Sequence, residues 1–203
     1  QFIRLYSKGE KMNYKLLALV PMIAAGALIK NNKQLKVTNY NLEFKNLPEE
    51  FHNFKIAQVS DIHCDKVGIS DFLEKLCKFS PDIIVITGDI LDSYRNDMDI
   101  VYNILSQLSA VAPCYFVTGN HELRLPKEFE ELKNMFERLN ISYLHNEVRS
   151  IYKTNDKINL IGIEDYNYFK AKDELNHREN FQDILSKLSD KNEFNILLSH
   201  RPE

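Results

Sequence analysis

Four short and almost continuously apolar segments stand out along the chain, and they read FKIAQVS, DIIVITGD, CYFVTGN and FNILLSH. Runs of this length that are rich in β-branched and aromatic residues predict strands buried on both faces of a sheet. Between them, apolar residues recur at helical spacing in residues 72–79, 98–108, 129–139 and 181–188. Buried strands that alternate with amphipathic helices predict an α/β domain with a largely parallel or mixed central sheet.

Weaker patterns predict further elements. Residues 35–44, LKVTNYNLEF, alternate like a half-buried strand, and residues 141–163 contain three short strand-like segments. For the helix over residues 72–79 we expect Ser70 as the N-cap, because a serine hydroxyl can accept a hydrogen bond from the first backbone N–H groups of a helix.

Residues 1–34 differ from the rest and are predicted to be a leader that precedes a domain spanning residues 35–203. Residues 16–29, LLALVPMIAAGALI, are apolar throughout. This stretch is shorter than the about 20 residues of a membrane-spanning helix and fits the roughly 7–15 residues of a signal-peptide core. Ala25-Gly26-Ala27 resembles a cleavage site. We interpret the stretch as an export signal or an uncleaved membrane anchor; the alternative is a buried core helix.

The composition sets broad limits on the class of protein. The chain has 203 residues, of which 44% are hydrophobic and 27% charged, and its net charge is -3. These values are typical of one globular domain and argue against disorder, a multi-span membrane protein or a dedicated nucleic-acid binder. Three cysteines make no disulfide framework. We expect Cys77 and Cys114 in the core, and we disfavour Cys64 as a metal ligand although it follows His63 directly.

Residues that commonly bind metal ions follow all four apolar strands. Because the carboxyl ends of parallel strands meet at one edge of a sheet, these side chains are expected to converge there. Carboxylate, imidazole and amide groups together suit Mn, Fe or Zn. Two neighbouring carboxylates repel each other unless a cation neutralises them, and a pair of metal ions can do so while holding a hydroxide between them. The candidate residues are Asp61, His63, Asp89, Asn120, His121 and His200.

Each candidate also has a plainer interpretation. A lone aspartate after a strand often caps the next helix, a lone histidine is mostly a surface or core residue, and Asn120 could form a turn. We assign His52, His145 and His177 to that plainer class, because none follows a buried strand in the same way. Coincidence at four strand ends favours a shared site for the others. Gly88 and Gly119 would allow sharp turns and a close approach of the backbone there.

The motifs Asp61-Ile62-His63, Gly88-Asp89, Gly119-Asn120-His121-Glu122 and His200 occur in an order that resembles the calcineurin-like metallophosphoesterases. The segments QVSDIH, PDIIVITGDILD, YFVTGNHE and LLSHRPE are most similar to a small bacterial phosphodiesterase-like subgroup, which is often exported or membrane-anchored. The resemblance implies an α/β sandwich of two mixed β-sheets flanked by helices. It also implies a bacterial cell-envelope location, with the apolar leader contacting the membrane.

The resemblance further implies roles for the individual residues around two divalent metal ions, Mn, Fe or Zn. Asp61 and His63 would bind the first metal, Asp89 would bridge both, and Asn120 and His200 would bind the second. His121 would be no ligand. The implied activity is metal-dependent hydrolysis of a phosphoester, a diester rather than a monoester, by a metal-bridging hydroxide, with His121 assisting the leaving group. A lipid-linked or nucleotide diester is the expected substrate. Glu122 would fix His121 or its loop, and Arg201 is expected to have a surface role.

One departure from the family concerns the C-terminus. The family closes with a Gly-His-x-His motif that supplies one further ligand to each metal, and no such motif follows His200. We therefore expect a C-terminally truncated chain whose fold is incomplete in the last strands of the second sheet. Such a chain is expected to bind metal weakly and to hydrolyse its substrate poorly or not at all. The alternative is a non-catalytic, membrane-tethered binding or scaffold relative that has lost the final ligands.

Overall fold

A computed structural model describes residues 2–6, 36–65, 68–94, 97–165 and 177–201. Its central sheet has six strands in the order β2-β1-β3-β4-β5-β6, and every neighbouring pair is parallel except β1 and β2. The four buried strands predicted from the sequence are therefore divided between two sheets, because the last of them is not in this one. The strands of the central sheet are Phe2–Tyr6 (β1), Lys36–Tyr40 (β2), Ile56–Val59 (β3), Ile83–Thr87 (β4), Cys114–Val117 (β5) and Ser142–Tyr143 (β6).

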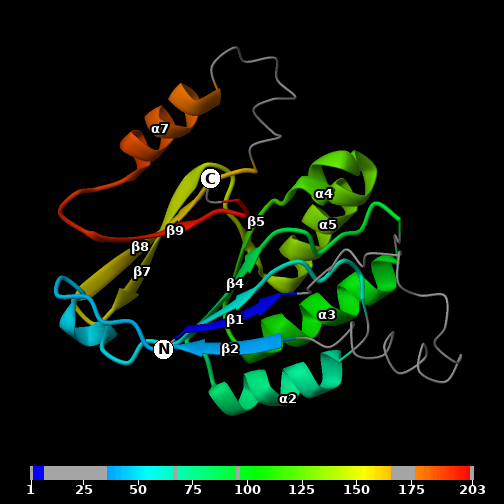
Figure 1. Cartoon of the computed structure of the whole chain (residues 1–203), viewed down its shortest axis with the longest axis horizontal. Coiled ribbons are helices and arrows are strands. Elements are labelled where there is room, and N and C mark those ends of the chain that lie inside the picture. Colours follow the sequence, from blue (N-terminus) through cyan, green and yellow to red (C-terminus); the bar gives the residue numbers. More distant parts are fainter. Residues whose placement is uncertain (1, 7–35, 66–67, 95–96, 166–176, 202–203) are drawn as a thin grey trace, which may run out of the picture.

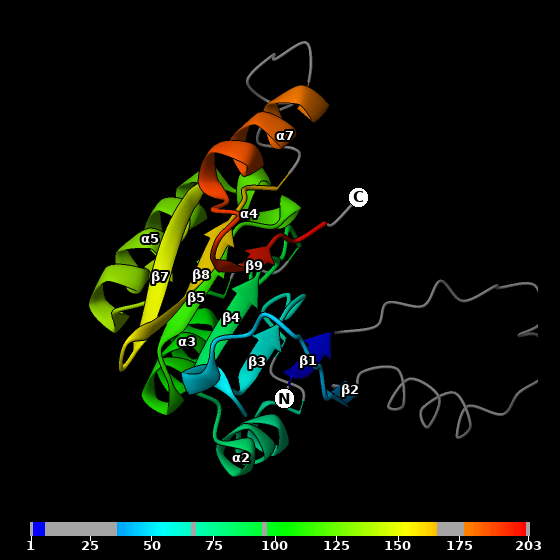
Figure 2. The same cartoon turned by 90° about the vertical axis from the view of Figure 1, so that its left-hand side faces the viewer.

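A second sheet contains three strands in the order β7-β8-β9. The strands Glu147–Lys153 (β7) and Asp156–Gly162 (β8) form an antiparallel hairpin, and Phe194–Leu198 (β9) pairs with β8 in parallel. The two sheets stack face to face with helices outside them, as Figures 1 and 2 show. The predicted α/β sandwich of two mixed sheets flanked by helices is confirmed.

The helices cover the outer face of each sheet. Ile69–Phe79 (α2), Met98–Val111 (α3) and Pro126–Leu139 (α5) pack on the central sheet, and His177–Leu188 (α7) packs on the second sheet. A short helix, Asn120–Arg124 (α4), follows β5 directly, and a 3-10 turn, Glu49–Phe51 (η2), precedes β3. Four layers result, in the order helices, central sheet, second sheet, helix (Figures 1 and 2).

Strand β4 shows why its sequence is continuously apolar. All five of its residues are buried. Ile84 and Ile86 pack against the helices, whereas Ile83 and Val85 face the second sheet. Successive side chains of a strand point to opposite faces, so a strand with protein on both sides needs apolar residues at every position.

Two local predictions are wrong. Helix α2 begins at Ile69 after Gly68, which has a left-handed backbone with φ of 79° and makes the turn without a side-chain cap, so Ser70 lies inside the helix. Cys77 is exposed, unlike Cys114, which is buried as predicted. Cys77 follows the buried Leu76, and successive helical residues are turned by about 100° around the axis. That rotation carries Cys77 away from the sheet.

Strand β9 is only partly buried, although its sequence predicts burial on both faces. Leu198 is buried, but the other four residues are partly or fully exposed, and Leu197 is 43% exposed. Among the described strands, β9 pairs with β8 alone, so it forms an edge of the second sheet. An edge strand has neighbours on one side only, which leaves its side chains more accessible than those of β4.

The N-terminal part of the chain is described only in part. β1 lies ahead of the domain boundary predicted at residue 35, and it places residues 2–6 in the central sheet, between β2 and β3. The apolar residues 16–29 fall outside the described residues, so the export signal or anchor stays a prediction. Across the described part of the chain, no helix combines the length and the apolar character required to span a membrane.

Candidate metal centre

The loops that follow β3 and β4 are joined backbone to backbone. The Asp61 N–H donates to the Gly88 carbonyl at 3.2 Å, and the His63 N–H donates to the Asp89 carbonyl at 3.0 Å. Asp61, His63 and Asp89 all adopt positive φ values, between 52° and 56°. Non-glycine residues seldom adopt this conformation, and clusters of it are typical of functional sites. The sharp turns bring two carboxylates and an imidazole to one edge of the central sheet.

Gly88 and Gly119 are required where the loops after β4 and β5 meet. A Cβ atom on Gly88 would lie 2.4 Å from the Gly119 nitrogen, and one on Gly119 would lie 2.2 Å from Asp89 Oδ1. Gly88 also has a left-handed φ of 80°. The predicted close approach of the backbone is thus confirmed for both glycines, and the predicted sharp turn is confirmed for Gly88, whereas Gly119 has an extended backbone.

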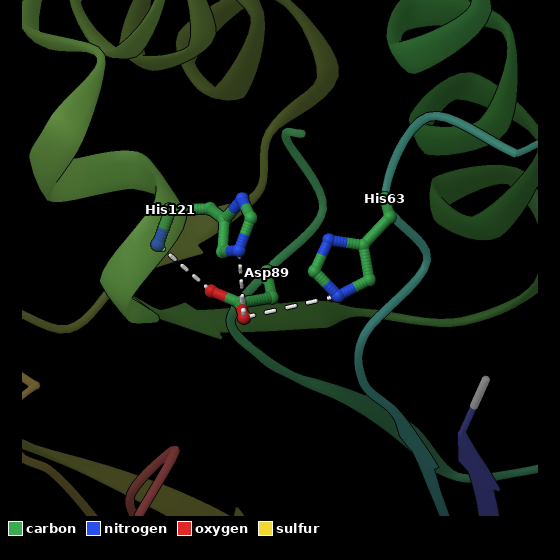
Figure 3. A group of neighbouring side chains, drawn as sticks. All are labelled: His63, Asp89 and His121. Atoms are coloured by element: carbon green, nitrogen blue, oxygen red, sulfur yellow. Dashed lines mark hydrogen bonds and ion pairs between the residues drawn. The ribbon is translucent and has the colours of Figure 1, made fainter. Parts of the chain in front are cut away.

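Asp89 is the centre of the cluster. Its Oδ2 atom lies 3.4 Å from His200 Nε2, 3.9 Å from His63 Nε2 and 4.0 Å from His121 Nε2. Its Oδ1 atom accepts a hydrogen bond of 2.9 Å from the His121 backbone N–H. Figure 3 shows His63 and His121 turned toward this carboxylate from two different segments. The imidazoles of three separate loops therefore converge on one buried carboxylate.

Asp61 extends the cluster on the side of β3. Its Oδ1 atom lies 3.8 Å from His63 Nε2, and its Oδ2 atom accepts a 2.6 Å hydrogen bond from the Ser60 hydroxyl. Asp61, Asp89 and His200 offer donor atoms that all lie within 4.8 Å of one another, and so do His63, Asp89 and His121. Asp89 is the residue that the two groups share.

The spacing of these atoms fits metal ligation better than direct hydrogen bonding. Two metal–ligand bonds of about 2.1 Å at a tetrahedral angle hold their donor atoms about 3.4 Å apart. The nitrogen–oxygen separations around Asp89 Oδ2 run from 3.4 to 4.0 Å, longer than a good hydrogen bond. Imidazole nitrogens together with carboxylate oxygens are ligands that suit Mn, Fe or Zn. The residues present thus fit a site for divalent cations that centres on Asp89.

His200 and His121 both turn Nε2 toward Asp89 Oδ2, but their Nδ1 partners favour different protonation of that atom. His200 Nδ1 lies 2.8 Å from the Thr87 carbonyl, which can only accept, so Nδ1 carries the proton and a neutral ring has its lone pair on Nε2. At His121 the Ser93 backbone N–H donates to Nδ1 at 3.1 Å, so a neutral ring carries its proton on Nε2. A neutral His200 therefore offers a lone pair at Nε2, whereas a neutral His121 offers an N–H there.

The charges in the cluster shift the pKa values of its members. Burial alone would raise the pKa of Asp89, but the His200 imidazole beside it and the hydrogen bond from the His121 backbone lower it below its ordinary value. Burial alone would lower the pKa of His200, but the Asp89 carboxylate outweighs it and raises the pKa to about 9. For His121, burial prevails and lowers the pKa. His121 is therefore neutral near pH 7.

Glu122 organises the backbone beneath the cluster, which agrees with the prediction that it fixes the loop. It is completely buried. Its Oε2 atom accepts hydrogen bonds from the backbone N–H groups of Asp89 (2.9 Å) and Gly119 (2.8 Å), and its Oε1 atom accepts one from Leu91 (3.0 Å). One carboxylate thus holds the loops after β4 and β5 together.

The structure also places the other residues considered from the sequence. Asn120 is the half-buried first residue of α4, between Gly119 and His121, and its role as a metal ligand stays a prediction. Cys64 is buried and its thiol points to the Ile90 carbonyl, 3.6 Å away, which fits a structural role. His52 is exposed, and the side chain of His177 lies outside the described residues.

Sequence reasoning missed a second polar cluster beside the first. Glu164 and Asp165 follow β8 and are buried. Glu164 accepts hydrogen bonds from the Thr118 hydroxyl and from the Tyr143 hydroxyl, and it pairs with His145 at 3.0 Å. The signal was present in the sequence as the apolar run INLIGI followed directly by two acids.

Arg201 also differs from its predicted surface role, because its guanidinium pairs with the buried Asp165. The Arg201 side chain is 38% exposed, so it does reach the surface while its guanidinium binds a buried partner. The sequence could not reveal the pair, because 35 residues separate its partners and nothing in the intervening stretch shows that β8 and β9 are neighbours.

A sandwich of two sheets with an Asp–His cluster at the strand ends is the arrangement of a metal-dependent phosphoesterase. The chain belongs to the calcineurin-like phosphoesterase family, whose sequence model matches residues 54–203. The class of reaction that follows is hydrolysis of a phosphoester.

Individual relatives support the same family. The chain is 30% identical over 196 residues to "Uncharacterized metallophosphoesterase YkoQ" of Bacillus subtilis. The match covers 94% of this chain and 68% of that protein. It is 26% identical over 156 residues to "Transmembrane protein with metallophosphoesterase domain" of Danio rerio. It is 28% identical over 130 residues to "UDP-2,3-diacylglucosamine pyrophosphatase LpxG" of Chlamydia trachomatis, over 59% of this chain and 39% of that protein.

A solved structure supports the fold. The phosphopantetheinyl hydrolase PptH of Mycobacterium tuberculosis superposes with a TM-score of 0.51 at 17% identity, over 72% of this chain and 68% of that chain. The match to the Danio rerio relative covers 73% of this chain but only 36% of that protein, so that relative extends well beyond the matched region.

Proposed function

We propose that the chain is the catalytic core of a metal-dependent phosphodiesterase, in which the cluster around Asp89 holds two divalent metal ions. The observation that carries the proposal is the position of Asp89 Oδ2, which has three imidazole Nε2 atoms within 4.0 Å, each from a different strand end. A buried carboxylate so placed can be shared by two cations, one on the Asp61 side and one on the His200 side.

The proposed ligands divide into two sets around the shared Asp89. Asp61 and His63 would hold the first ion, since His63 Nε2 lies 3.8 Å from Asp61 Oδ1. Asn120 and His200 would hold the second, with the lone pair of His200 Nε2 directed by the hydrogen bond from Nδ1 to Thr87. Two bound ions would supply positive charge to the attacking water and to the phosphoryl oxygens.

His121 is proposed to assist the leaving group. The Ser93 N–H occupies Nδ1, so the ring offers an Nε2–H, and burial keeps the ring neutral near pH 7. A neutral imidazole in this form can donate a hydrogen bond from its Nε2–H to the leaving oxygen, which stabilises the negative charge that develops as the phosphorus–oxygen bond breaks. His121 Nε2 also lies 4.0 Å from Asp89 Oδ2, close enough for a ligand, but binding a metal there would require loss of the Nε2 proton.

For the substrate we propose a lipid-linked phosphodiester or diphosphate near a membrane. The relative from Chlamydia trachomatis is named for action on a diacylated sugar nucleotide, and two relatives are named as transmembrane proteins. The apolar residues 16–29 fit the same setting as a signal or anchor in a bacterial envelope. Fractionation of cells that express the 203-residue chain tests the location, and recovery only in the soluble cytoplasmic fraction contradicts it.

Hydrolysis of bis-p-nitrophenyl phosphate and of p-nitrophenyl phosphate by the full-length protein, with added Mn²⁺, tests the activity. We expect faster hydrolysis of the diester and a loss of about 10³-fold in Asp89→Asn, because the bridging charge disappears. The control is Asp82→Asn, which changes an exposed aspartate just before β4, keeps an acceptor for the Lys55 backbone N–H and should leave the rate unchanged.

Each outcome distinguishes the two functions under consideration. Equal rates in Asp89→Asn and in the unchanged chain contradict the bridging role. Binding of Mn²⁺ without hydrolysis of either substrate favours the non-catalytic binding relative instead.

A further inference from the structure

The end of the second sheet carries an ion pair that the proposed mechanism leaves without a role. Strands β8 and β9 are parallel, with Gly162 opposite Leu198, so the residues that follow them emerge at the same edge. The Ile163 N–H donates to the Leu198 carbonyl at 3.0 Å and extends the pairing beyond the strands. This pairing brings Asp165 beside Arg201.

The ion pair is bidentate and anchored from the buried side. Arg201 Nε donates to Asp165 Oδ2 at 2.7 Å, and Nη2 donates to Oδ1. The Asp165 side chain has no exposed surface, whereas that of Arg201 is 38% exposed. A two-point contact of this kind fixes the orientation of the guanidinium plane as well as its distance from the carboxylate. The buried aspartate therefore sets where the arginine lies.

Asp165 is in turn fixed to the central sheet. Its backbone N–H donates to the Thr118 hydroxyl at 3.3 Å, and the same hydroxyl donates to Glu164. Thr118 directly precedes Gly119, the glycine that touches Asp89. Asp165 thus occupies a fixed position relative to the loops that carry the other proposed ligands.

His200 stands directly before Arg201 and is the residue that brings the second sheet to the metal centre. Its ring reaches across to the central sheet, with Nδ1 2.8 Å from the Thr87 carbonyl and Nε2 3.4 Å from Asp89 Oδ2. Within the described residues, β9 has a strand partner on one side only. The Arg201 contact therefore restrains the chain just where it leaves an edge strand.

Stability alone gives a weak reason for the pair. Burying a carboxylate has a large desolvation cost, and an ion pair in such a place often contributes little more to stability than apolar residues of the same volume. Fixing the position of a neighbouring residue is a different benefit, and the residue next to Arg201 is a proposed metal ligand.

We propose that Asp165 is a positioning residue for the second metal site, which holds His200 toward Asp89 by clamping Arg201. This inference rests on the proposed metal centre and adds a residue that acts on it without touching metal or substrate.

Titration of the metal-free chain with Mn²⁺ by calorimetry tests the inference, with Asp165→Asn as the variant. We expect one of the two sites to weaken by about 10–100-fold, the usual effect of removing a residue that orients a ligand, and the other site to keep its affinity. The matched control is Lys157→Met. This change removes the 3.1 Å ion pair with Glu193, which joins β8 and β9 at their N-terminal ends, away from the metal centre. It should leave both sites unchanged.

A second variant approaches the pair from its exposed partner. Arg201→Gln should cause the same selective loss, and it keeps the test decisive if the uncompensated Arg201 of Asp165→Asn impairs folding. A metal-independent readout accompanies both variants. In the metal-free chain the Nδ1 proton of His200, bonded to the Thr87 carbonyl, should exchange slowly with water by NMR, and faster exchange is expected in both variants but not in Lys157→Met.

Different failures point to different conclusions. Unchanged Mn²⁺ affinities and unchanged proton exchange in both variants overturn the positioning role while the metal centre stands. Equal weakening of both sites also overturns it, since a general loss of structure would do the same. A wild-type chain that binds no Mn²⁺ removes the metal centre itself, together with any role of Asp165 in it.

Discussion

His121 and His200 have the same side chain and lie within 4.0 Å of the same carboxylate oxygen, yet their surroundings prepare them for different chemistry. At His121 a backbone N–H donates to Nδ1, so the proton of the neutral ring is on Nε2. At His200 a backbone carbonyl accepts from Nδ1, so the lone pair of the neutral ring is on Nε2. Residue type alone could not separate these roles. The backbone groups of Ser93 and Thr87 do so.

Replacing His121 tests this difference. In His121→Ala, metal binding should persist while the rate of diester hydrolysis falls by about 10²–10³-fold, the usual cost of removing one donor that stabilises developing charge. Calorimetric titration with Mn²⁺ and steady-state rates measure the two effects separately. Loss of a metal ion from the variant would show that His121 is a ligand instead.

The raised pKa of His200 predicts opposite effects of pH on folding and on metal binding. The folded-state value of about 9 lies above the ordinary 6.5, so the protonated ring stabilises the metal-free fold below pH 6.5, and this contribution is lost as the pH rises through 9. A metal ion must displace that proton. Affinity at this site should therefore rise by about tenfold per pH unit up to pH 9.

Unfolding in urea and Mn²⁺ titrations between pH 6.5 and 8.5 measure both trends. His200→Gln serves as the control because it has no ring proton to lose, so the pH dependence should flatten in that variant. Parallel slopes in the two proteins would assign the proton to another group.

At the scale of elements, the sequence predicted the strand ends well and the edges poorly. The runs that lead to Asp61, Asp89 and His121 are apolar because β3, β4 and β5 lie inside the central sheet, and a ligand-type residue after such a run is a local pattern. FNILLSH has a similar composition, but among the described strands β9 lies at an edge and is only partly buried. Strand neighbours are not encoded within a single segment.

The same reason explains the residues that were missed. Glu164 and Asp165 follow an apolar run as the predicted ligands do, but their partners lie far away in sequence. Their contacts with Thr118 and Arg201 form because β8 lies next to β9 and faces β5. The turn before α2 shows a smaller version of this problem, because Gly68 and Ser70 both suit a helix start and only the backbone conformation selects the glycine.

The whole molecule depends on the contact between its two sheets. Ile83, Val85 and Val117 of the central sheet meet Leu160 and Leu198 of the second sheet in one apolar cluster. The metal centre lies at the edge of this contact, since His200 comes from one sheet and Asp89 from the other. Any change that separates the sheets would also separate the proposed ligands.

Truncation of Leu160 tests the contribution of this interface. The residue is fully buried, so Leu160→Ala should lower the free energy of unfolding by about 2–5 kcal/mol through lost burial and a residual cavity. Leu197→Ala in the neighbouring strand is the matched control, because its side chain is 43% exposed and should cost little. Chemical denaturation measures both, and similar losses in the two variants would contradict the observed packing.

The span of the Asp89–His200 pair across the two sheets has a consequence for the life of the protein in a cell. Ions held between the sheets would act as a removable cross-link that exists only in the folded state. At a free metal concentration a hundred times the dissociation constant, such binding adds about 2.7 kcal/mol to stability. Metal starvation would then silence the enzyme and also expose it to proteolysis, so the amount of protein would follow the supply of its metal.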